Sequence, residues 1–448
     1  MITLQERVHG TPPPSTWALG KLHRVLRVRK NFKNLGMKED NLLSLSYGRI
    51  IRRDIETAAG LLPESFETYQ IVEPGNIVMR LTDLQNDKRS LRQALVRERG
   101  IITSAYDALE LGPEHDPRFW AYALLALDLA KYYYSLGGGV RQSINFADFP
   151  NDWIAVPGGR VQKSIADFLD RETARIDLLI EKKKRMCAVA AERLQAQISL
   201  RATRGFCGSP DLVQSNVPYL GLVPKHWHIV KLGSRYSVQL GKMLDAARIH
   251  GNDLRPYLRV ADVQWGEIRV TDLPQMDFSV SDRRKFRLER GDLLVNEGGS
   301  YVGRSAIWAA PIEECYYQKA LHRLRPYRPD RDTARFLYYL MTFATKQGVF
   351  VAGGNQTTID HLTAEALRRY RFAFPPFSEQ QKIADELATL EEKTLKVVNA
   401  IEESIKSLGD YRDSLITAAV TGKIDTSSQQ KDTSKGCDLE AIEAELPT

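Results

Sequence analysis

The chain has 448 residues, enough for two or three domains that each bury a core. Hydrophobic residues make up 43% and charged residues 27%, which is typical of a globular protein, and the longest apolar stretch, residues 121–130, is too short to span a bilayer. The net charge of +7 favours a polyanionic partner, although many basic proteins bind none.

The cysteines and histidines indicate a cytoplasmic protein without a metal site. The four cysteines lie far apart and form no C-x-x-C pair, which is typical of reduced thiols rather than of a disulfide framework or a zinc site. His226 and His228 alternate, but no further ligand follows at a suitable spacing. The N-terminal residues lack the apolar core of a signal peptide.

Parts of the sequence occur twice. Pro14-Ser15-Thr16-Trp17 recurs as Pro224-Lys225-His226-Trp227, and Ile165-Ala166-Asp167 recurs as Ile383-Ala384-Asp385. In both copies a globular block with short strands precedes a long helix. A chain that repeats one large unit forms a pseudo-dimer with an approximate two-fold axis. The expected fold is α+β, with two mixed globular domains separated by two long antiparallel helices.

The first block, residues 1–160, contains candidate DNA-binding loops. Residues 72–79 predict a turn that leads into a buried strand, and residues 80–92 then form a dense run of hydrogen-bond donors and acceptors. A glycine turn follows at residues 138–144, where the backbone can approach a ligand closely. The candidate DNA contacts, chosen because their side chains read bases or hold phosphates, are Arg80, Gln85, Asn86, Lys88, Arg89, Arg141 and Gln142. The alternatives are solvated loop charges and a plain hairpin turn.

A long helix follows the first block. Apolar residues at steps of three and four predict it over residues 161–203, within a segment 161–205 that carries ten basic and six acidic residues. Pro150 and the stretch at residues 157–159 separate the helix from the block. Residues 206–221, which contain Gly, Ser, Pro and Asn, predict a linker to the second copy.

The second block, residues 222–377, repeats the order of the first with different loop residues. Residues 288–295 predict the turn and buried strand, residues 296–304 the polar loop, and residues 353–359 the glycine turn, with Ile359 in the place of Ile144. The candidate DNA contacts here are Asn296, Tyr301, Arg304, Asn355, Gln356 and Thr357. Two similar scaffolds with different loops are what two heads that read different sequences would need.

The second long helix is predicted over residues 378–423, with Ser378 as its N-cap and Gly422 near its end. Pro375-Pro376 separate it from the block. Residues 379–423 carry six basic and nine acidic residues, so the two helices have opposite net charges and are expected to pack together through their apolar stripes. A coiled coil without further role is the alternative. Residues 424–448 are polar and acidic and are expected to be a disordered tail.

Sequence motifs of catalysis are missing. No P-loop, G-x-S-x-G or H-E-x-x-H motif occurs. Residues 216–219 faintly resemble the tetrapeptide of amino-group DNA methyltransferases, but no glycine loop between a strand and a helix precedes them. Glu391 and Lys393 have a spacing used by nucleases, but they are predicted to lie on the solvent side of the helix. These patterns indicate a binding protein.

Several of these segments together resemble the specificity subunit of type I restriction–modification systems. They are the helix openings at residues 168–177 and 378–384, the helix end at residues 415–424, and the block opening at residues 221–227. The resemblance covers nearly the whole chain. The first block departs from the second, since it has Asn76 where the second has Asp292 and lacks Gly-Leu-Val before its opening proline.

The resemblance implies a non-catalytic, cytoplasmic subunit of a phage-defence complex that has type I site-specific deoxyribonuclease and DNA adenine methyltransferase activities. Each block would be a target-recognition domain that reads one half of a bipartite, asymmetric site on double-stranded DNA. The helices would set the spacing and dock two methyltransferase subunits, with Lys182, Lys183, Lys184 and Arg185 as candidate docking residues. Restriction subunits would join this core. The chain would bind no cofactor itself; S-adenosylmethionine, ATP and Mg²⁺ are expected on the partner subunits.

Two other functions are consistent with parts of the sequence. A self-sufficient DNA adenine methyltransferase would bind S-adenosylmethionine without partners, and the missing motifs argue against it. A coiled-coil scaffold would bind no DNA, whereas a DNA-recognition subunit would bind duplexes with steep salt dependence.

Overall fold

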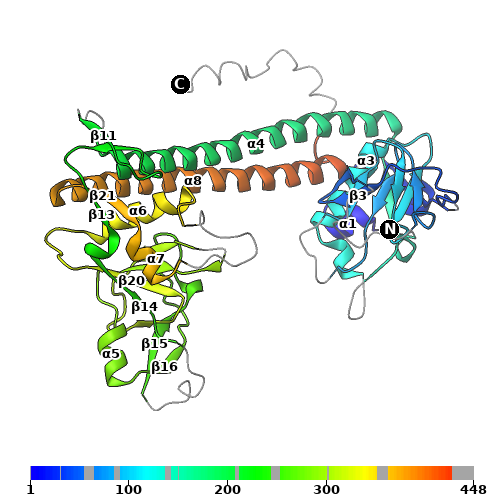
Figure 1. Cartoon of the computed structure of the whole chain (residues 1–448). Helices are drawn as coiled ribbons and strands as arrows, with labels where there is room; N and C mark the ends of the chain where they lie inside the picture. Colours follow the sequence, from blue (N-terminus) through cyan, green and yellow to red (C-terminus); the bar gives the residue numbers. More distant parts are fainter. Residues whose placement is uncertain are drawn as a thin grey trace. The chain divides into compact units, whose positions relative to one another are not determined.

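The computed structural model describes residues 2–30, 32–54, 65–84, 91–136, 143–149, 151–206, 211–243, 253–299, 302–350 and 362–425. The chain divides into two compact units: unit 1 consists of Met1–Lys183 and Glu402–Thr448, and unit 2 of Lys184–Ile401. Both units mix helices with short strands, which confirms the predicted mixed composition (Figure 1). The unit boundary falls inside the long helices α4 (Gly159–Arg204) and α8 (Phe377–Val420) rather than at their starts.

Unit 1 contains a four-stranded antiparallel sheet in the order β2-β9-β6-β7. Three antiparallel strand pairs, β1–β10, β3–β4 and β5–β8, surround it. The strands are β1 (Ala18–Lys21), β2 (Leu26–Val28), β3 (Leu43–Ser46), β4 (Arg49–Arg52), β5 (Gln70–Val72), β6 (Ile77–Met79), β7 (Gln93–Leu95), β8 (Gly100–Ile102), β9 (Asp107–Leu111) and β10 (Trp153–Val156). The shorter helices are α1 (Leu4–His9), α2 (Leu22–Val25) and α3 (Pro117–Leu129), with 3-10 turns η1 (Tyr132–Ser135) and η2 (Phe146–Asp148).

The core of unit 1 lies on both faces of this sheet, because successive side chains of a strand point to opposite faces. Ile77 and Met79 belong to the cluster that contains the apolar face of α3, whereas Val78 between them packs with residues of β3. Asp116 caps the first turn of α3 by accepting a hydrogen bond from the Arg118 amide at 2.9 Å, and Pro117 suits the first helical position. The predicted buried strand is therefore confirmed as β6.

Unit 2 contains a four-stranded antiparallel sheet in the order β14-β20-β17-β18. A second sheet, β16-β15-β19, and the pairs β13–β21 and β11–β12 complete it. The strands are β11 (Leu212–Gln214), β12 (Leu222–Pro224), β13 (His228–Lys231), β14 (Tyr236–Leu240), β15 (Leu254–Leu258), β16 (Gln275–Asp277), β17 (Leu293–Asn296), β18 (Ser305–Ile307), β19 (Tyr316–Tyr317), β20 (Leu321–Pro326) and β21 (Arg371–Phe374). The shorter helices are α5 (Val280–Phe286), α6 (Ala334–Lys346) and α7 (Ala364–Arg369), with 3-10 turns η3 (Leu232–Ser234) and η5 (Val260–Asp262).

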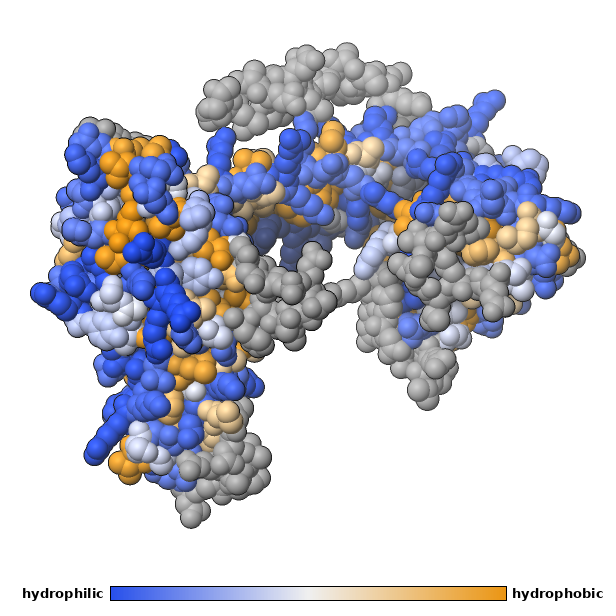
Figure 2. Space-filling model, viewed as in Figure 1, coloured by the Kyte–Doolittle hydropathy of each residue, from blue (hydrophilic) through white to orange (hydrophobic). Residues whose placement is uncertain are grey.

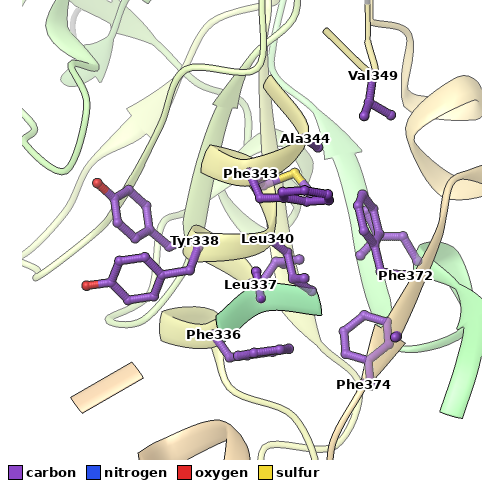
Figure 3. Close-up of a cluster of buried hydrophobic side chains, with 14 of the residues drawn as sticks. Phe336, Leu337, Tyr338, Leu340, Phe343, Ala344, Val349, Phe372 and Phe374 are labelled. Atoms are coloured by element: carbon purple, nitrogen blue, oxygen red, sulfur yellow. The ribbon is translucent and has the colours of Figure 1, made fainter. Parts of the chain in front are cut away.

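Helix α6 supplies much of the core of unit 2. Its apolar side chains, among them Phe336, Leu340 and Phe343, gather against Phe372 and Phe374 of β21 (Figure 3). Leu293 and Val295 of β17 belong to the same cluster, whereas Leu294 joins a separate cluster on the other face of the sheet. The central sheets of the two units thus have the same strand order, the same directions and a helix of 13 residues on one face.

The long helices α4 and α8 pack against each other within each unit (Figure 1). They run antiparallel, because the start of one helix lies beside the end of the other. In unit 1 Asp177 of α4 accepts a hydrogen bond from Arg412 of α8 at 2.8 Å, and apolar residues near the start of α4 cluster with those near the end of α8. In unit 2 Arg201 of α4 pairs with Glu386 of α8 at 2.8 Å. The two predicted helices correspond to α4 and α8 within two residues at each start.

Two predictions of local structure were wrong. Ser378 is not the N-cap of α8, because the Pro376 carbonyl already accepts hydrogen bonds from the amides of Glu379 and Gln380, and the helix begins at Phe377. The segment expected as a linker contains β11, since Val213 pairs with Val223 in an antiparallel hairpin. In the described part of the chain, no helix is long and apolar enough to cross a membrane.

Candidate nucleic-acid interface

A tight turn positions the start of each candidate loop. Gly75 and Gly291 both have a φ of +92°, which favours glycine. In unit 1 the Asn76 side chain accepts a hydrogen bond from the Glu73 amide at 2.8 Å, and in unit 2 Asp292 accepts one from the Glu289 amide at 2.7 Å. The same turn is therefore held by an amide in one unit and by a carboxylate in the other.

An arginine partner accounts for the difference between Asn76 and Asp292. Arg29 donates one hydrogen bond to Asn76 Oδ1 at 2.7 Å. Arg325 instead donates two to Asp292, at 2.6 and 2.7 Å, in the bidentate geometry that a carboxylate allows. This substitution, seen in the sequence as a departure between the blocks, thus preserves the turn.

Backbone hydrogen bonds close each polar loop. The Arg80 amide donates to the Arg92 carbonyl at 2.7 Å, and the Asn296 amide donates to the Arg304 carbonyl at 2.8 Å. Both closing arginines point inward: Arg92 donates to the Thr82 carbonyl at 3.2 Å, and Arg304 to Gln264 Oε1 at 2.7 Å. The loops therefore leave the sheets at matching edges and carry different residues between their ends.

The structure places only three of the predicted DNA contacts. Arg80 is half-buried at the end of β6. Asn296 is fully buried and Arg304 is 7% exposed, so both side chains lie inside unit 2, and their assignment as DNA contacts stays a prediction. Both residues lie where β17 still pairs with its neighbour β18, so their side chains point into unit 2. The other candidates, Gln85, Asn86, Lys88, Arg89, Arg141, Gln142, Tyr301, Asn355, Gln356 and Thr357, lie outside the described residues.

The segments that follow the glycine turns return to the same strand ends. The Ile144 amide donates to the Leu81 carbonyl at 3.0 Å, and the Leu362 amide donates to the Glu297 carbonyl at 2.6 Å. In unit 2, the backbone contact that Ile144 makes in unit 1 is thus made by Leu362. Ile359, which the sequence pairs with Ile144, lies outside the described residues.

Buried polar side chains that the sequence did not predict lie beneath both loops. In unit 1 Asp128 of α3 accepts a hydrogen bond from the Arg92 amide at 2.7 Å, and burial raises the pKa of its carboxyl to about 6. In unit 2 His322 of β20 donates from Nε2 to the Leu362 carbonyl at 2.6 Å, and burial lowers the pKa of this imidazole. Asp128 interrupts an apolar run in the sequence, and this interruption is the sequence feature that could have indicated a buried polar residue.

Exposed basic side chains are also present in unit 2, away from the predicted loops. Arg284, Lys285, Arg287 and Arg290 follow one another at and after α5, and all four are exposed. The Ser279 hydroxyl accepts a hydrogen bond from the Asp282 amide at 3.2 Å and caps this helix. Such side chains are suited to phosphate contacts, which position a protein on a duplex without reading its sequence.

The predicted docking residues lie on α4. Lys182, Lys184 and Arg185 are exposed and Lys183 is half-buried. Apolar side chains of unit 2 are exposed on the same helix at Met186 and Val189 and on α8 at Leu395 and Val397, and Figure 2 shows apolar side chains at the surface along the helices. Exposed apolar side chains beside basic ones are typical of a protein interface rather than of a solvated helix face.

Comparison with known proteins finds a family that part of the chain resembles. Residues 224–407 match the family described as the type I restriction modification DNA specificity domain. The chain is therefore similar to the type I restriction–modification specificity subunits. It is 22% identical over 217 residues to the type I restriction enzyme EcoBI specificity subunit of Escherichia coli, a match that covers 48% of this chain and 43% of that protein. The match thus spans less than half of this curated relative.

One solved structure shares the fold of this chain. A chain from a structure of the assembly and conformational transition of a type I restriction–modification system superimposes with a TM-score of 0.63 at 16% identity. That match covers 92% of this chain and 100% of the other. The HsdS subunit from Thermoanaerobacter tengcongensis, at 15% identity, gives a TM-score of 0.49 over 92% of this chain and 98% of that chain.

Proposed function

We propose that this chain is a specificity subunit that recognises a bipartite, asymmetric DNA site, with each unit reading one half. The observation that carries the proposal is that equivalent strand ends, at Arg80 and Asn296, open and close loops whose residues differ between the units. A shared scaffold with different loops supplies two reading heads of different specificity. Exposed arginines and lysines of unit 2 would hold the phosphates.

The two units are proposed to be copies of one ancestral unit, as the recurring sequence segments suggest. The matching sheet orders, the turns at Gly75 and Gly291, and the paired loop closures support this. The long helices α4 and α8 would then set the number of unread base pairs between the half-sites. Their antiparallel packing within each unit is suited to a stiff spacer.

The partners are proposed to be two methyltransferase subunits and, through them, restriction subunits. The basic residues Lys182–Arg185 of α4, three of which are exposed, and the apolar side chains beyond them would form a docking surface. The specificity subunit itself would be non-catalytic and cytoplasmic. S-adenosylmethionine, ATP and Mg²⁺ would be bound by the partner subunits, where methyl transfer and DNA cleavage take place.

The experiment that tests this function maps methylated positions in DNA exposed to the assembled complex. We expect a single bipartite site for the wild type. Replacing Asn355, Gln356 and Thr357 together with Ala should relax one half-site and leave the other intact. The matched control replaces Arg141 and Gln142 with Ala and should affect the opposite half only.

Three outcomes would contradict the proposal. Unchanged methylation at both halves in both variants would mean that these turns do not read DNA. Methylation by the purified chain alone with S-adenosylmethionine would identify a self-sufficient methyltransferase instead. Binding of the chain to a duplex that is insensitive to salt would also argue against phosphate contacts.

A further inference from the structure

A buried glutamine at the start of α8 joins this helix to α6. Gln380 is fully buried in the first turn of α8. Its amide nitrogen donates to the carbonyls of Arg331 and Pro375, at 3.1 and 3.0 Å, and its oxygen accepts a hydrogen bond from the Thr333 amide at 3.1 Å. Thr333 is the N-cap of α6. One side chain therefore connects the start of the long helix to the start of the helix that carries the core of unit 2.

Unit 1 contains the same arrangement at the start of α4. Gln162 is 1% exposed, its nitrogen donates to the Pro157 carbonyl at 2.8 Å, and its oxygen accepts from the Asp116 amide at 3.0 Å. Asp116 is the N-cap of α3. The amide oxygen also accepts from the Trp120 indole at 3.1 Å. We call the Gln162 contacts and the Gln380 contacts the glutamine clamps.

An ion pair accompanies each glutamine clamp. Arg118, two residues after the N-cap of α3, pairs with Asp167 of α4 at 2.8 Å. Arg335, two residues after the N-cap of α6, pairs with Asp385 of α8 at 2.5 Å. Both aspartates lie five residues after their glutamine. We call the globular part of each unit its head. Each head thus contacts its long helix at two successive points, the buried glutamine and the more exposed ion pair.

We propose that Gln162 and Gln380 are positioning residues that set the angle between each head and its long helix. This inference rests on the proposed function, because a head that pivots on its helix would change the distance between the half-sites. The glutamine amide is suited to this role, since it has two donors and two acceptor positions and both of its ends are used. An apolar side chain would fill the space but would leave the Thr333 amide and two carbonyls without partners.

The geometry separates this role from general stabilisation. A residue that only stabilises unit 2 adds to its unfolding free energy wherever in the core it packs. Gln380 instead contacts backbone groups on both sides of the joint, by which we mean the place where the head meets the long helix. Loss of its hydrogen bonds should therefore loosen the joint more than it loosens the core. A displacement of about 3 Å at the end of the head corresponds to one base pair of DNA.

The first test measures the joint directly in the full chain. Spin labels on unnatural amino acids at Gln275 of β16 and Lys393 of α8 report a distance within unit 2, and both positions are exposed. We expect Gln380→Met to broaden this distance distribution by about 3 Å relative to the wild type. The matched control is Leu340→Ala, which removes a fully buried side chain of α6 and should lower the melting temperature without broadening the distribution.

A second variant keeps the test informative if Gln380→Met does not fold. Gln380→Glu places carboxylate oxygens against the Pro375 and Arg331 carbonyls, which repel them. Protonation restores a donor, so the distribution should be narrower in acid than in base for this variant and unchanged for the wild type. Equal widths at all pH values for Gln380→Glu, or equal widths for Gln380→Met and the wild type, would overturn the proposal.

Mapping of methylated sites links the joint to function. We expect Gln380→Met to methylate sites whose gap differs by about one base pair from that of the wild type, with both half-site sequences unchanged. Leu340→Ala should keep the wild-type gap. If the wild-type complex recognises no bipartite site, the proposed function is wrong. The distance measurement then still tests whether Gln380 fixes the angle between head and helix. A bipartite wild-type site together with an unchanged gap in Gln380→Met would contradict the clamp alone.

Discussion

The carboxyl group of Asp128 makes the stability of unit 1 depend on pH. It is fully buried on α3, and one of its oxygens accepts a hydrogen bond from the Arg92 amide. Burial raises its pKa to about 6, whereas an aspartate in the unfolded chain has a pKa of about 3.9. As the pH rises between these values, the unfolded chain loses its proton first. The unfolding free energy should therefore fall with rising pH, by up to about 3 kcal/mol.

Replacing Asp128 with Asn should remove this dependence. The amide oxygen can still accept the hydrogen bond from Arg92, and no charge needs to be buried. We expect Asp128→Asn to be more stable than the wild type by about 1–2 kcal/mol at slightly basic pH, with the difference shrinking towards pH 4. Urea denaturation of both proteins across this range measures it. A variant that is less stable than the wild type in base would mean that the carboxylate stabilises the fold.

The structural roles of some residues follow from the local sequence pattern, and these could be predicted. The roles of other residues depend on contacts between distant segments, and these could not. The turns at Gly75 and Gly291 were predicted because glycine precedes a buried strand in both blocks. The burial of Asn296 could not be predicted, because nothing in its sequence neighbours shows whether a polar residue at a strand end turns inward. The role of Gln380 could not be predicted, since its partners Arg331 and Thr333 lie far from it in the sequence.

Among the elements, α4 offers the surface whose function can be tested most directly. We expect reversal of charge at Lys182, Lys183, Lys184 and Arg185 to weaken assembly with methyltransferase subunits at least about tenfold. The melting temperature should change little, because exposed substitutions alter stability by about 0.5 kcal/mol or less. Titration of labelled specificity subunit with the partner subunit measures the first effect and thermal unfolding the second.

The control for this experiment reverses an equal number of charges elsewhere on the molecule. Four exposed basic residues of unit 2 are suitable, namely Arg269, Lys285, Arg290 and Lys319. These reversals should leave assembly intact and weaken DNA binding. Normal assembly of the α4 variant would place the docking surface elsewhere on the chain.

The long helices were also the elements that the sequence predicted best. Their apolar periodicity extends over more than forty residues, so the pattern is far stronger than that of a strand of three. The strands of the two units are short, and their order in the sheets depends on pairings between distant residues. That order could not be predicted from the sequence, even though several individual strands could.

At the scale of the whole molecule, the proposed spacer can be lengthened in a controlled way. An insertion in α4 alone would displace it against α8, so a matched insertion is needed in both helices. The Arg201–Glu386 pair of unit 2 sets the register there and places Ala188 close to Ala400. Four residues added at each of these positions lengthen both helices by about 6 Å and rotate the attached segment by about 40°.

We expect this double insertion to increase the gap between half-sites by about two base pairs, because the rise of duplex DNA is about 3.4 Å per base pair. The half-site sequences should stay the same, since the loops are untouched. Sequencing of methylated DNA tests both expectations. An unchanged gap would mean that the helices do not measure distance, and altered half-sites would mean that the units do not read independently.

The position of the unit boundary has a consequence for building chimaeras of this subunit. The prolines before α4 and α8 look like natural cutting points, but a junction there would divide each glutamine clamp and each ion pair between two parents. The boundary after Lys183 and before Glu402 passes through both helices and leaves these contacts within one parent. Recombination in mid-helix therefore transfers a head together with the joint that holds it, so the exchanged part brings its own geometry as well as its own specificity.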